Sequence, residues 1–365
     1  MVDLILLLII GVVLFLLILG VLAPLESLGW YAGWIGEKVD ESDTLDALSD
    51  IEKTKKPLPN EMEHYIVYLS GIGSFTGSSI PMEEPPFLDA LQKNLPGSIV
   101  IKDVFPYSVT NVGLTGERLM SRVWKRIEAM RPVNPNSAWL YLVVIRNLFQ
   151  VAVSADKRYG PVYNLGVAKE VWRTLLRHGY RPGSKKPVTL IGTSGGGQVS
   201  VGSATYLSYI LEDTPLRVVS MGGVVSSDEG LLHMDHFYHL YGTLDSTQAL
   251  GEKVFPGRWP GAVNSVWHKA EAEGKISMIE LGPFGHTGAG SMFDQGTKMP
   301  DGRRNFDVTL EKLTNVLVTF YDMPEGETSA ISPKVVETGD VAPADDVALT
   351  ANVAASDSVQ QDEDG

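Results

Sequence analysis

Short apolar runs bounded by polar residues or glycine mark the middle of the chain. His64–Leu69, Val188–Ile191, Phe237–Tyr241 and Ile276–Leu281 have this pattern, which is typical of buried strands. The stretch Val199–Tyr209 is instead typical of a helix. Near the end of the chain, apolar residues fall mostly on one helical face, as a helix that covers a sheet requires: Val308, Leu310, Leu313, Val316, Leu317 and Phe320. The pattern therefore predicts strands interspersed with helices.

The first apolar stretch has a different character, because Leu4–Leu25 contains no charged residue. Some 22 helical residues span roughly 33 Å, enough to cross the hydrocarbon core of a bilayer. Trp30, Tyr31 and Trp34 follow where the aromatic belt of a membrane span would be expected, at the level of the lipid headgroups. A cleaved signal peptide is the alternative, but the stretch lacks a basic start and is too long. We predict a retained single-pass membrane anchor, whose orientation the flanking charges leave open.

A second apolar stretch, Ala138–Ala155, is interrupted by polar residues that share one helical face, Arg146, Asn147 and Gln150. An arginine at the centre of a bilayer costs about 2.5–3.5 kcal/mol. We predict an amphipathic cap helix. Burial in the core, a membrane-facing lid and a second span remain alternatives.

Composition and charge limit the class of protein. The chain has 365 residues, 44% of them hydrophobic, and no cysteine, so it can bury one large core and has no disulfide framework. Its net charge of −14 argues against nucleic-acid binding. Much of that charge belongs to the segment 323–365, which is poor in aromatic residues and predicted to be a disordered acidic tail.

A serine between glycines follows the predicted strand Val188–Ile191, in the pattern Gly192-x-Ser194-x-Gly196. This pattern fits a nucleophile elbow, in which a tight strand-to-helix turn raises the serine hydroxyl above the edge of a sheet. A glycine-rich loop without chemistry is the alternative, and a phosphate-binding loop is disfavoured because no Gly-Lys-Ser/Thr follows.

An acid and a histidine follow the serine in the order that a serine hydrolase requires. Asp245 comes just after the predicted strand Phe237–Tyr241, and His286 lies on the loop after Ile276–Leu281. The imidazole would take the serine proton while the carboxylate orients the ring. Asp228, which follows an earlier strand, is the alternative acid.

Two backbone N–H groups would stabilise an oxyanion. Gly195 follows the serine and provides the first. The second is expected from the loop after His64–Leu69, at Ile72 or Gly73. His233, His236 and His239 are spaced by three and could bind a metal together only if all three lay on one helix. His239 belongs to the predicted strand Phe237–Tyr241, so we expect no metal site there. We also expect no cofactor.

Taken together, these residues resemble the α/β-hydrolase family over Glu61–Asp322. The resemblance implies a mostly parallel sheet with covering helices at Glu117–Met130, Pro161–Arg177 and Phe306–Tyr321, and a cap insertion at about 107–157. It places strands near residues 65–70, 99–104, 187–192, 216–221, 236–242 and 276–281. Two departures from the family pattern are the Ser70-Gly71 pair, where many members carry His-Gly, and the lack of the first two strands of the full sheet.

The sequence thus predicts a membrane-anchored serine hydrolase with an anchor at 4–25, a juxtamembrane tether at 26–60 and a catalytic domain at 61–322. Its substrate would be an acyl ester, with a thioester, amide or lipid as alternatives. Its partners would be this substrate and the lipid bilayer; protein partners are not predicted. The rival class is a non-catalytic, membrane-tethered binding or scaffold protein of the same fold. We expect deletion of residues 1–40 to leave an active soluble domain, and trimming after Met323 to change neither folding nor activity.

Overall fold

The computed structural model describes residues 22–34, 62–116, 121–134 and 137–319, together with residues 6, 7, 10, 11, 14, 17, 18 and 20. The predicted acidic tail at 323–365 and most of the predicted tether lie outside the described residues. So does part of the predicted membrane span. The described residues between 6 and 22 are helical, and their large apolar side chains are exposed, among them Leu7, Leu14 and Leu17.

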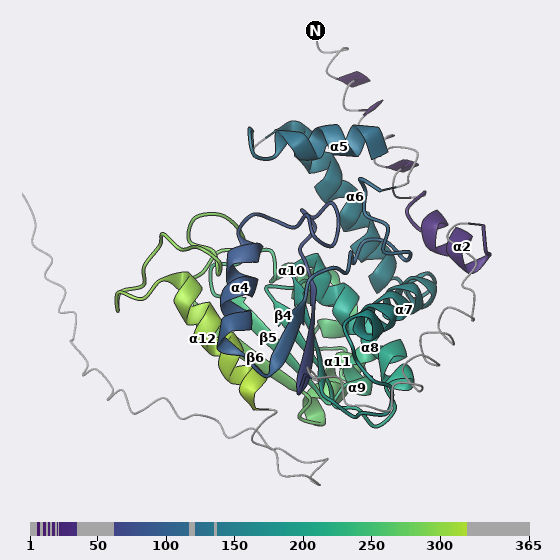
Figure 1. Ribbon diagram of the computed structural model, residues 1–365. Coiled ribbons are helices and arrows are strands. Elements are labelled where there is room, and N and C mark those ends of the chain that lie inside the picture. Colours follow the sequence, from purple (N-terminus) through teal and green to yellow (C-terminus); the bar gives the residue numbers. More distant parts are fainter. Residues whose placement is uncertain are drawn as a thin grey trace, which may run out of the picture. The chain divides into compact units, whose positions relative to one another are not determined.

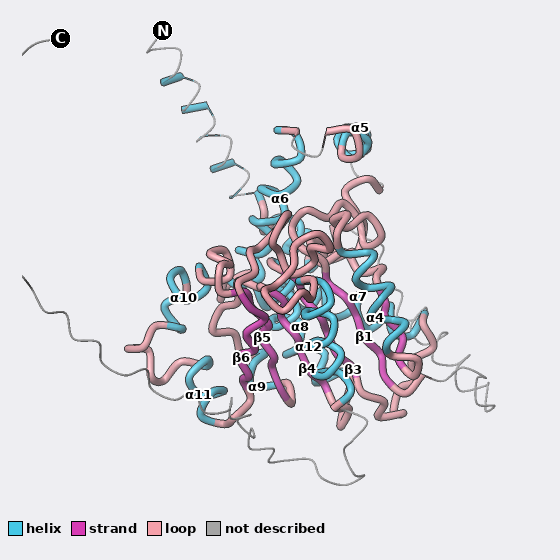
Figure 2. Tube along the Cα trace, turned by 90° about the vertical axis from the view of Figure 1, so that its left-hand side faces the viewer, coloured by secondary structure: helices cyan, strands magenta, loops and turns pink. Residues whose placement is uncertain are grey.

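Six strands form one parallel sheet in the order β2-β1-β3-β4-β5-β6. They lie side by side in Figure 2. Their bounds are β1 His64–Leu69, β2 Ser98–Ile101, β3 Val188–Thr193, β4 Leu216–Met221, β5 His236–Gly242 and β6 Ile276–Gly282. The prediction of an α/β fold with a mostly parallel sheet is confirmed, and each strand overlaps its expected position.

Helices cover both faces of this sheet (Figure 1). One face packs against α7 (Gly160–Arg177), α8 (Gly195–Ile210), α9 (Gly230–His233) and α11 (Val266–Ala272). The other packs against α4 (Glu84–Asn94) and α12 (Asn305–Val318). Short helices α10 (Leu250–Val254) and η1 (Pro256–Arg258) follow β5.

Both faces of the central strands are buried, which explains their continuous apolar sequence. In β1, Tyr65 and Val67 belong to the core beneath α7 and α8, whereas Ile66 and Tyr68 belong to the core beneath α4 and α12. Alternate side chains of a strand point to opposite faces, so each strand contributes to two hydrophobic layers.

The predicted cap insertion contains two helices, α5 (Ser121–Met130) and α6 (Ala138–Ala155). They enclose a third apolar cluster next to the sheet: Phe75, Phe105, Tyr107, Leu114, Ile127, Val143 and Val151. The polar residues Asn147 and Gln150 of α6 are buried, whereas Trp139 and Tyr141 are exposed. Among the described residues, α6 alone has the length and apolar composition of a membrane-crossing helix, and only a third of it is buried.

The predicted tether begins with a packed element. Helix α2 (Leu25–Tyr31) lies against α7, and Lys169 of α7 lies over the Trp30 ring at 5.5 Å. The first residues of the range 26–60 are therefore part of the folded domain, a contact that local composition does not reveal.

The strand order places a topological switch point at the carboxyl ends of β1 and β3. The chain leaves β1 toward β2 on one side, whereas β3 lies on the other side of β1. Loops that follow β1 and β3 therefore diverge at their carboxyl ends, where open α/β sheets bind ligands. Both the loop Ser70–Ser74 and Ser194 lie at this switch point.

Candidate active site

Ser194 occupies the sharp turn between β3 and α8. Its backbone has φ 52° and ψ −121°, a conformation that costs a residue with a side chain on the order of 1–3 kcal/mol. The flanking glycines make the turn possible. A Cβ on Gly192 would lie 2.4 Å from the carbonyl oxygen of Gly196, and a Cβ on Gly196 would lie 2.2 Å from that of Leu69. This strand-to-helix turn is the local geometry that a nucleophile elbow requires.

His286 lies between Ser194 and Asp245. Its Nε2 is 3.0 Å from Ser194 Oγ, and its Nδ1 is 2.8 Å from Asp245 Oδ2. A carboxylate only accepts hydrogen bonds, so Nδ1–H donates to Asp245 and the neutral ring presents Nε2 as an acceptor for the serine hydroxyl. The structure thus brings together the three residues that the sequence predicts as nucleophile, base and acid.

Asp245 is held by the turn that follows β5. Its Oδ1 accepts hydrogen bonds from the backbone N–H groups of Thr247 (2.9 Å) and Gln248 (3.1 Å), which leaves Oδ2 directed at the histidine. The carboxylate side chain is fully buried, whereas the His286 ring is 19% exposed. A buried and satisfied carboxylate fixes the orientation of the imidazole in a way that an exposed one would not.

Asp228, the alternative acid, is engaged elsewhere. Its Oδ1 accepts the Gly230 N–H at 3.0 Å, and its Oδ2 lies 3.3 Å from Gln198 Nε2. Burial raises the pKa of this carboxyl. The geometry therefore favours Asp245 as the partner of His286, because the carboxylate of Asp228 is engaged by Gly230 and Gln198.

The predicted oxyanion donors lie close together. Gly195 begins α8, and a Cβ on it would lie 2.6 Å from Cγ2 of Ile72. Among the described residues, no protein acceptor takes the N–H group of Gly195, Ile72 or Gly73. Side chains hold the loop from outside: Asn147 donates to the Ile72 and Ser74 carbonyls, and Arg131 donates to that of Gly73.

Two further features of the site were not identified from the sequence. Gly222 follows β4 with φ 59°, and a Cβ there would lie 2.9 Å from Asp245 Oδ2 and 3.6 Å from His286 Nδ1. Glu84 begins α4 and accepts the Gly71 N–H at 3.3 Å, while its Oε2 has no partner among the described residues. Burial raises the pKa of Glu84 to about 8, so this carboxyl is protonated at neutral pH.

The three histidines lie on two elements, with His233 at the end of α9 and the other two on β5. His236 and His239 are three residues apart on β5, so their side chains point to opposite faces. His236 contacts Ser277 and His239 contacts Gln248. Burial lowers the pKa of each to about 4, so both rings are neutral at pH 7. No group of three or more potential metal ligands is present among the described residues.

Comparison with known proteins adds no identification. The chain matches no protein-family model and no curated protein. The function of the site therefore has to be argued from its geometry.

Proposed function

We propose that this protein is a membrane-anchored serine hydrolase of the α/β-hydrolase type that cleaves an acyl ester. The observation that carries the proposal is the continuous hydrogen-bonded path from Ser194 Oγ through His286 to Asp245, at a turn with elbow geometry. Serine, imidazole and carboxylate in this connectivity are the components of nucleophilic acyl transfer.

In the first half-reaction, Ser194 Oγ attacks the acyl carbonyl carbon while its proton passes to His286 Nε2. Asp245 Oδ2 stabilises the imidazolium through the Nδ1–H bond. The carbonyl oxygen becomes an oxyanion, for which the N–H groups of Gly195 and of Ile72 or Gly73 are the nearby donors. Collapse of the intermediate expels the alcohol, which takes the proton from Nε2, and leaves the acyl group on Ser194.

In the second half-reaction, a water molecule replaces the alcohol. His286 Nε2 accepts a proton from this water, which attacks the acyl-serine carbonyl and forms a second oxyanion. The C–O bond to Ser194 then breaks, the proton returns to Ser194 Oγ, and the carboxylic acid product leaves. An acceptor other than water would give acyl transfer by the same steps.

A membrane location suits a lipid as the acyl substrate. The predicted span Leu4–Leu25 would hold the domain at the bilayer, and the cap exposes apolar side chains at Trp139, Tyr141 and Leu148. Helix α5 also exposes basic side chains at Arg122, Lys125 and Arg126. Apolar and basic groups together are the features that bind anionic membrane surfaces.

Steady-state hydrolysis of a short p-nitrophenyl ester tests the proposal. We expect the full-length protein in detergent to turn over this ester, and Ser194→Ala to lower kcat by roughly 10⁴-fold or more. Ser203→Ala provides a matched control, because this serine lies in the same helix and donates to the Val199 carbonyl. Absence of turnover in the native protein would favour the non-catalytic scaffold.

A further inference from the structure

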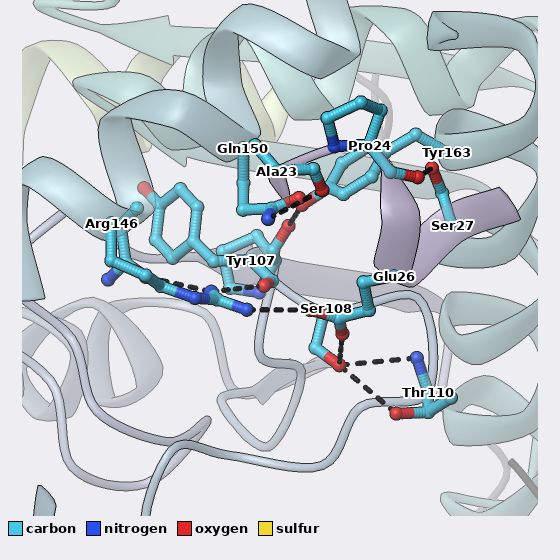
Figure 3. A network of polar contacts seen from close by, with 12 residues as sticks. Ala23, Pro24, Glu26, Ser27, Tyr107, Ser108, Thr110, Arg146, Gln150 and Tyr163 are labelled. Carbon is cyan, nitrogen blue, oxygen red and sulfur yellow. Dashed lines mark hydrogen bonds and ion pairs between the residues drawn. The ribbon is translucent and has the colours of Figure 1, made fainter. Parts of the chain in front are cut away.

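An ion pair joins the juxtamembrane helix to the cap. Glu26 Oε2 of α2 lies 2.8 Å from Arg146 Nη2 of α6, and both side chains are only 14% exposed. Ser108 donates to the other carboxylate oxygen of Glu26 at 2.8 Å. Figure 3 shows these contacts in one network. Loss of either member would leave a charge in a poorly solvated position, so the pair resists separation.

The same arginine orients Asn147, which holds the loop after β1. Arg146 Nη1 donates to Asn147 Oδ1 at 3.0 Å, so the amide NH₂ of Asn147 must face the other way. There it donates to the carbonyl oxygens of Ile72 (2.8 Å) and Ser74 (2.9 Å). Asn147 is fully buried. We call Ser70–Ser74 the oxyanion loop.

Holding the Ile72 carbonyl fixes an N–H group. In a planar trans peptide the C=O of one residue and the N–H of the next point in opposite directions. A bond from Asn147 to Ile72 O therefore fixes the direction of the Gly73 N–H, one of the two candidate second donors. A tilt of this peptide would move the donor away from the oxyanion position, where displacements of about 1 Å cost roughly 10²-fold in rate.

A second path links Arg146 to the other end of the loop. Arg146 donates to the backbone carbonyl of Tyr107, and the Tyr107 hydroxyl donates to the Ser70 carbonyl at 2.8 Å. That hydroxyl would also lie 3.3 Å from a Cβ on Gly195, next to the first oxyanion donor. Arg146 therefore contacts residues that restrain both ends of the oxyanion loop.

Further contacts hold the segment Ala23–Tyr31 against the cap. Gln150 Nε2 of α6 donates to the Ala23 carbonyl at 3.2 Å (Figure 3). One turn earlier, a Cβ on Gly20 would lie 3.0 Å from the Phe149 ring, so the chain passes close to α6. These contacts place Glu26 where it can meet Arg146.

We propose that the segment Ala23–Tyr31 belongs to the active site, because Glu26 acts through Arg146 and Asn147 to preorganise the oxyanion loop. The three side chains are positioning residues, and none of them touches the reacting atoms. This inference rests on the proposed hydrolase function. It differs from the expectation that the domain keeps its activity after deletion of residues 1–40.

The test uses the full-length protein with Glu26→Gln, Arg146→Gln and Asn147→Leu. Each variant keeps Ser194, His286 and Asp245 but loosens the oxyanion loop. We therefore expect kcat for the p-nitrophenyl ester to fall about 10- to 100-fold, with KM changed less than threefold. Affinity for a boronic acid, which forms a tetrahedral adduct with the serine, should fall in parallel with kcat. Titration with a fluorophosphonate counts the protein molecules whose Ser194 reacts. Dividing the rate by this number gives kcat per folded site.

Arg158→Gln is the matched control. Arg158 forms an ion pair with Asp156 just after α6, but it is 77% exposed and makes no contact with the oxyanion loop. It should keep native kcat. Glu26→Gln and Asn147→Leu combined should cost less than the product of the single effects, because both act on one path.

Two results would overturn the inference, and they are distinguishable from failure of the hydrolase proposal. Native kcat and boronate affinity in the titrated Glu26→Gln and Asn147→Leu variants would show that the loop needs no such support. Multiplicative effects of the two substitutions would show that they act separately. A native protein without turnover or labelling would instead contradict the hydrolase function itself, on which the inference depends.

Discussion

At the scale of single residues, the contact between the candidate acid and base depends on a position without a side chain. Gly222 lies beside the hydrogen bond between Asp245 and His286, at a distance that leaves no room for a methyl group. Its positive φ also disfavours any other residue. The acid and the base can approach each other because a glycine follows β4 at this position.

Gly222→Ala should therefore affect both folding and turnover. The left-handed backbone costs about 1–2 kcal/mol, and the contact with Asp245 Oδ2 adds a further penalty of about 1–3 kcal/mol. We expect kcat to fall at least 100-fold because the carboxylate is displaced. Gly183→Ala is the control, since Gly183 has φ 76° and open space around its Cβ position. Equal losses of stability and native turnover in both variants would contradict this account.

The choice between the two acids gives a second prediction at this scale. Asp245→Asn should lower kcat by roughly 10³- to 10⁴-fold while the protein stays folded, because the imidazole loses its tautomer and its charge partner. Asp228→Asn should remain within a few-fold of native, since Asp228 contacts Gln198 and Gly230. Ester turnover by the two folded variants decides the question. The reverse ranking would assign the acid to Asp228.

At the scale of elements, the first turn of α4 supports the loop after β1. Glu84 accepts a hydrogen bond from the Gly71 N–H, and a Cβ on Gly71 would lie 3.7 Å from Ser194 Cβ. Burial raises the pKa of the neighbouring Glu83 as well, partly offset by His286 nearby. Two carboxyls of one helix turn therefore lie close to the candidate site.

Glu84 makes stability depend on pH. Its pKa is about 8 in the folded protein and near 4.5 in the unfolded chain. The folded state therefore holds a proton that the unfolded state has lost, so this group reduces stability progressively as pH rises from 4.5 to 8. The full effect is at most on the order of 5 kcal/mol.

Glu84→Gln should remove this pH dependence. We expect the fall in Tm between pH 5 and pH 8 to be smaller in the variant than in the native protein, as measured by circular dichroism. The exposed Glu212 provides the control, because Glu212→Gln should leave the pH profile unchanged. An unaltered profile in Glu84→Gln would mean that Glu84 is ionised in the folded protein at pH 7.

Four of the six strands of the described sheet and the three candidate catalytic side chains could be predicted from local sequence signals, whereas β2 and β4 were expected only from the family resemblance. Ser194 follows β3, which is apolar and buried along its whole length, and Asp245 and His286 follow the mainly apolar runs of β5 and β6. The edge strand β6 is mostly half-buried or exposed, so its pattern indicated a strand but overstated its burial. Since parallel strands end at the same edge, residues after different strands meet there. The positions of the three residues after successive strands were therefore sufficient to predict that their side chains meet.

Other parts of the site depend on contacts between distant segments and have no local signal. Glu26 and Arg146 are 120 residues apart. The sequence around either residue does not indicate that the two form an ion pair. The polar face of α6 was recognised from Arg146, Asn147 and Gln150, but their partners were not. Gly222 and Glu84 were missed because the need for space or for a buried acceptor arises only in the folded structure.

At the scale of the whole molecule, the two proposals give the N-terminal region two separable roles. The apolar stretch up to residue 22 would provide the membrane location, whereas Ala23–Tyr31 packs against α6 and α7. A boundary between these roles falls near Leu22. Location and activity should therefore respond to different truncations.

Two truncated proteins test this separation. A chain that starts at Ala23 should lose membrane association in flotation assays but keep kcat within a few-fold of native. A chain that starts after Asp40 lacks Glu26 as well, and its kcat per titrated site should fall about 10- to 100-fold. Equal and native kcat in both proteins would restore the view that the N-terminal region adds location alone.

The central claim is that Ser194 is the nucleophile of a hydrolase, and covalent labelling tests it most directly. The full-length native protein and Ser194→Ala are incubated with a fluorophosphonate, and the adduct is mapped by peptide mass spectrometry. We predict one adduct per chain, on Ser194, and none in the variant. Among the described residues, this serine alone is hydrogen-bonded to a histidine that an aspartate orients. No adduct on the native protein, or equal labelling of Ser194→Ala, would contradict the claim.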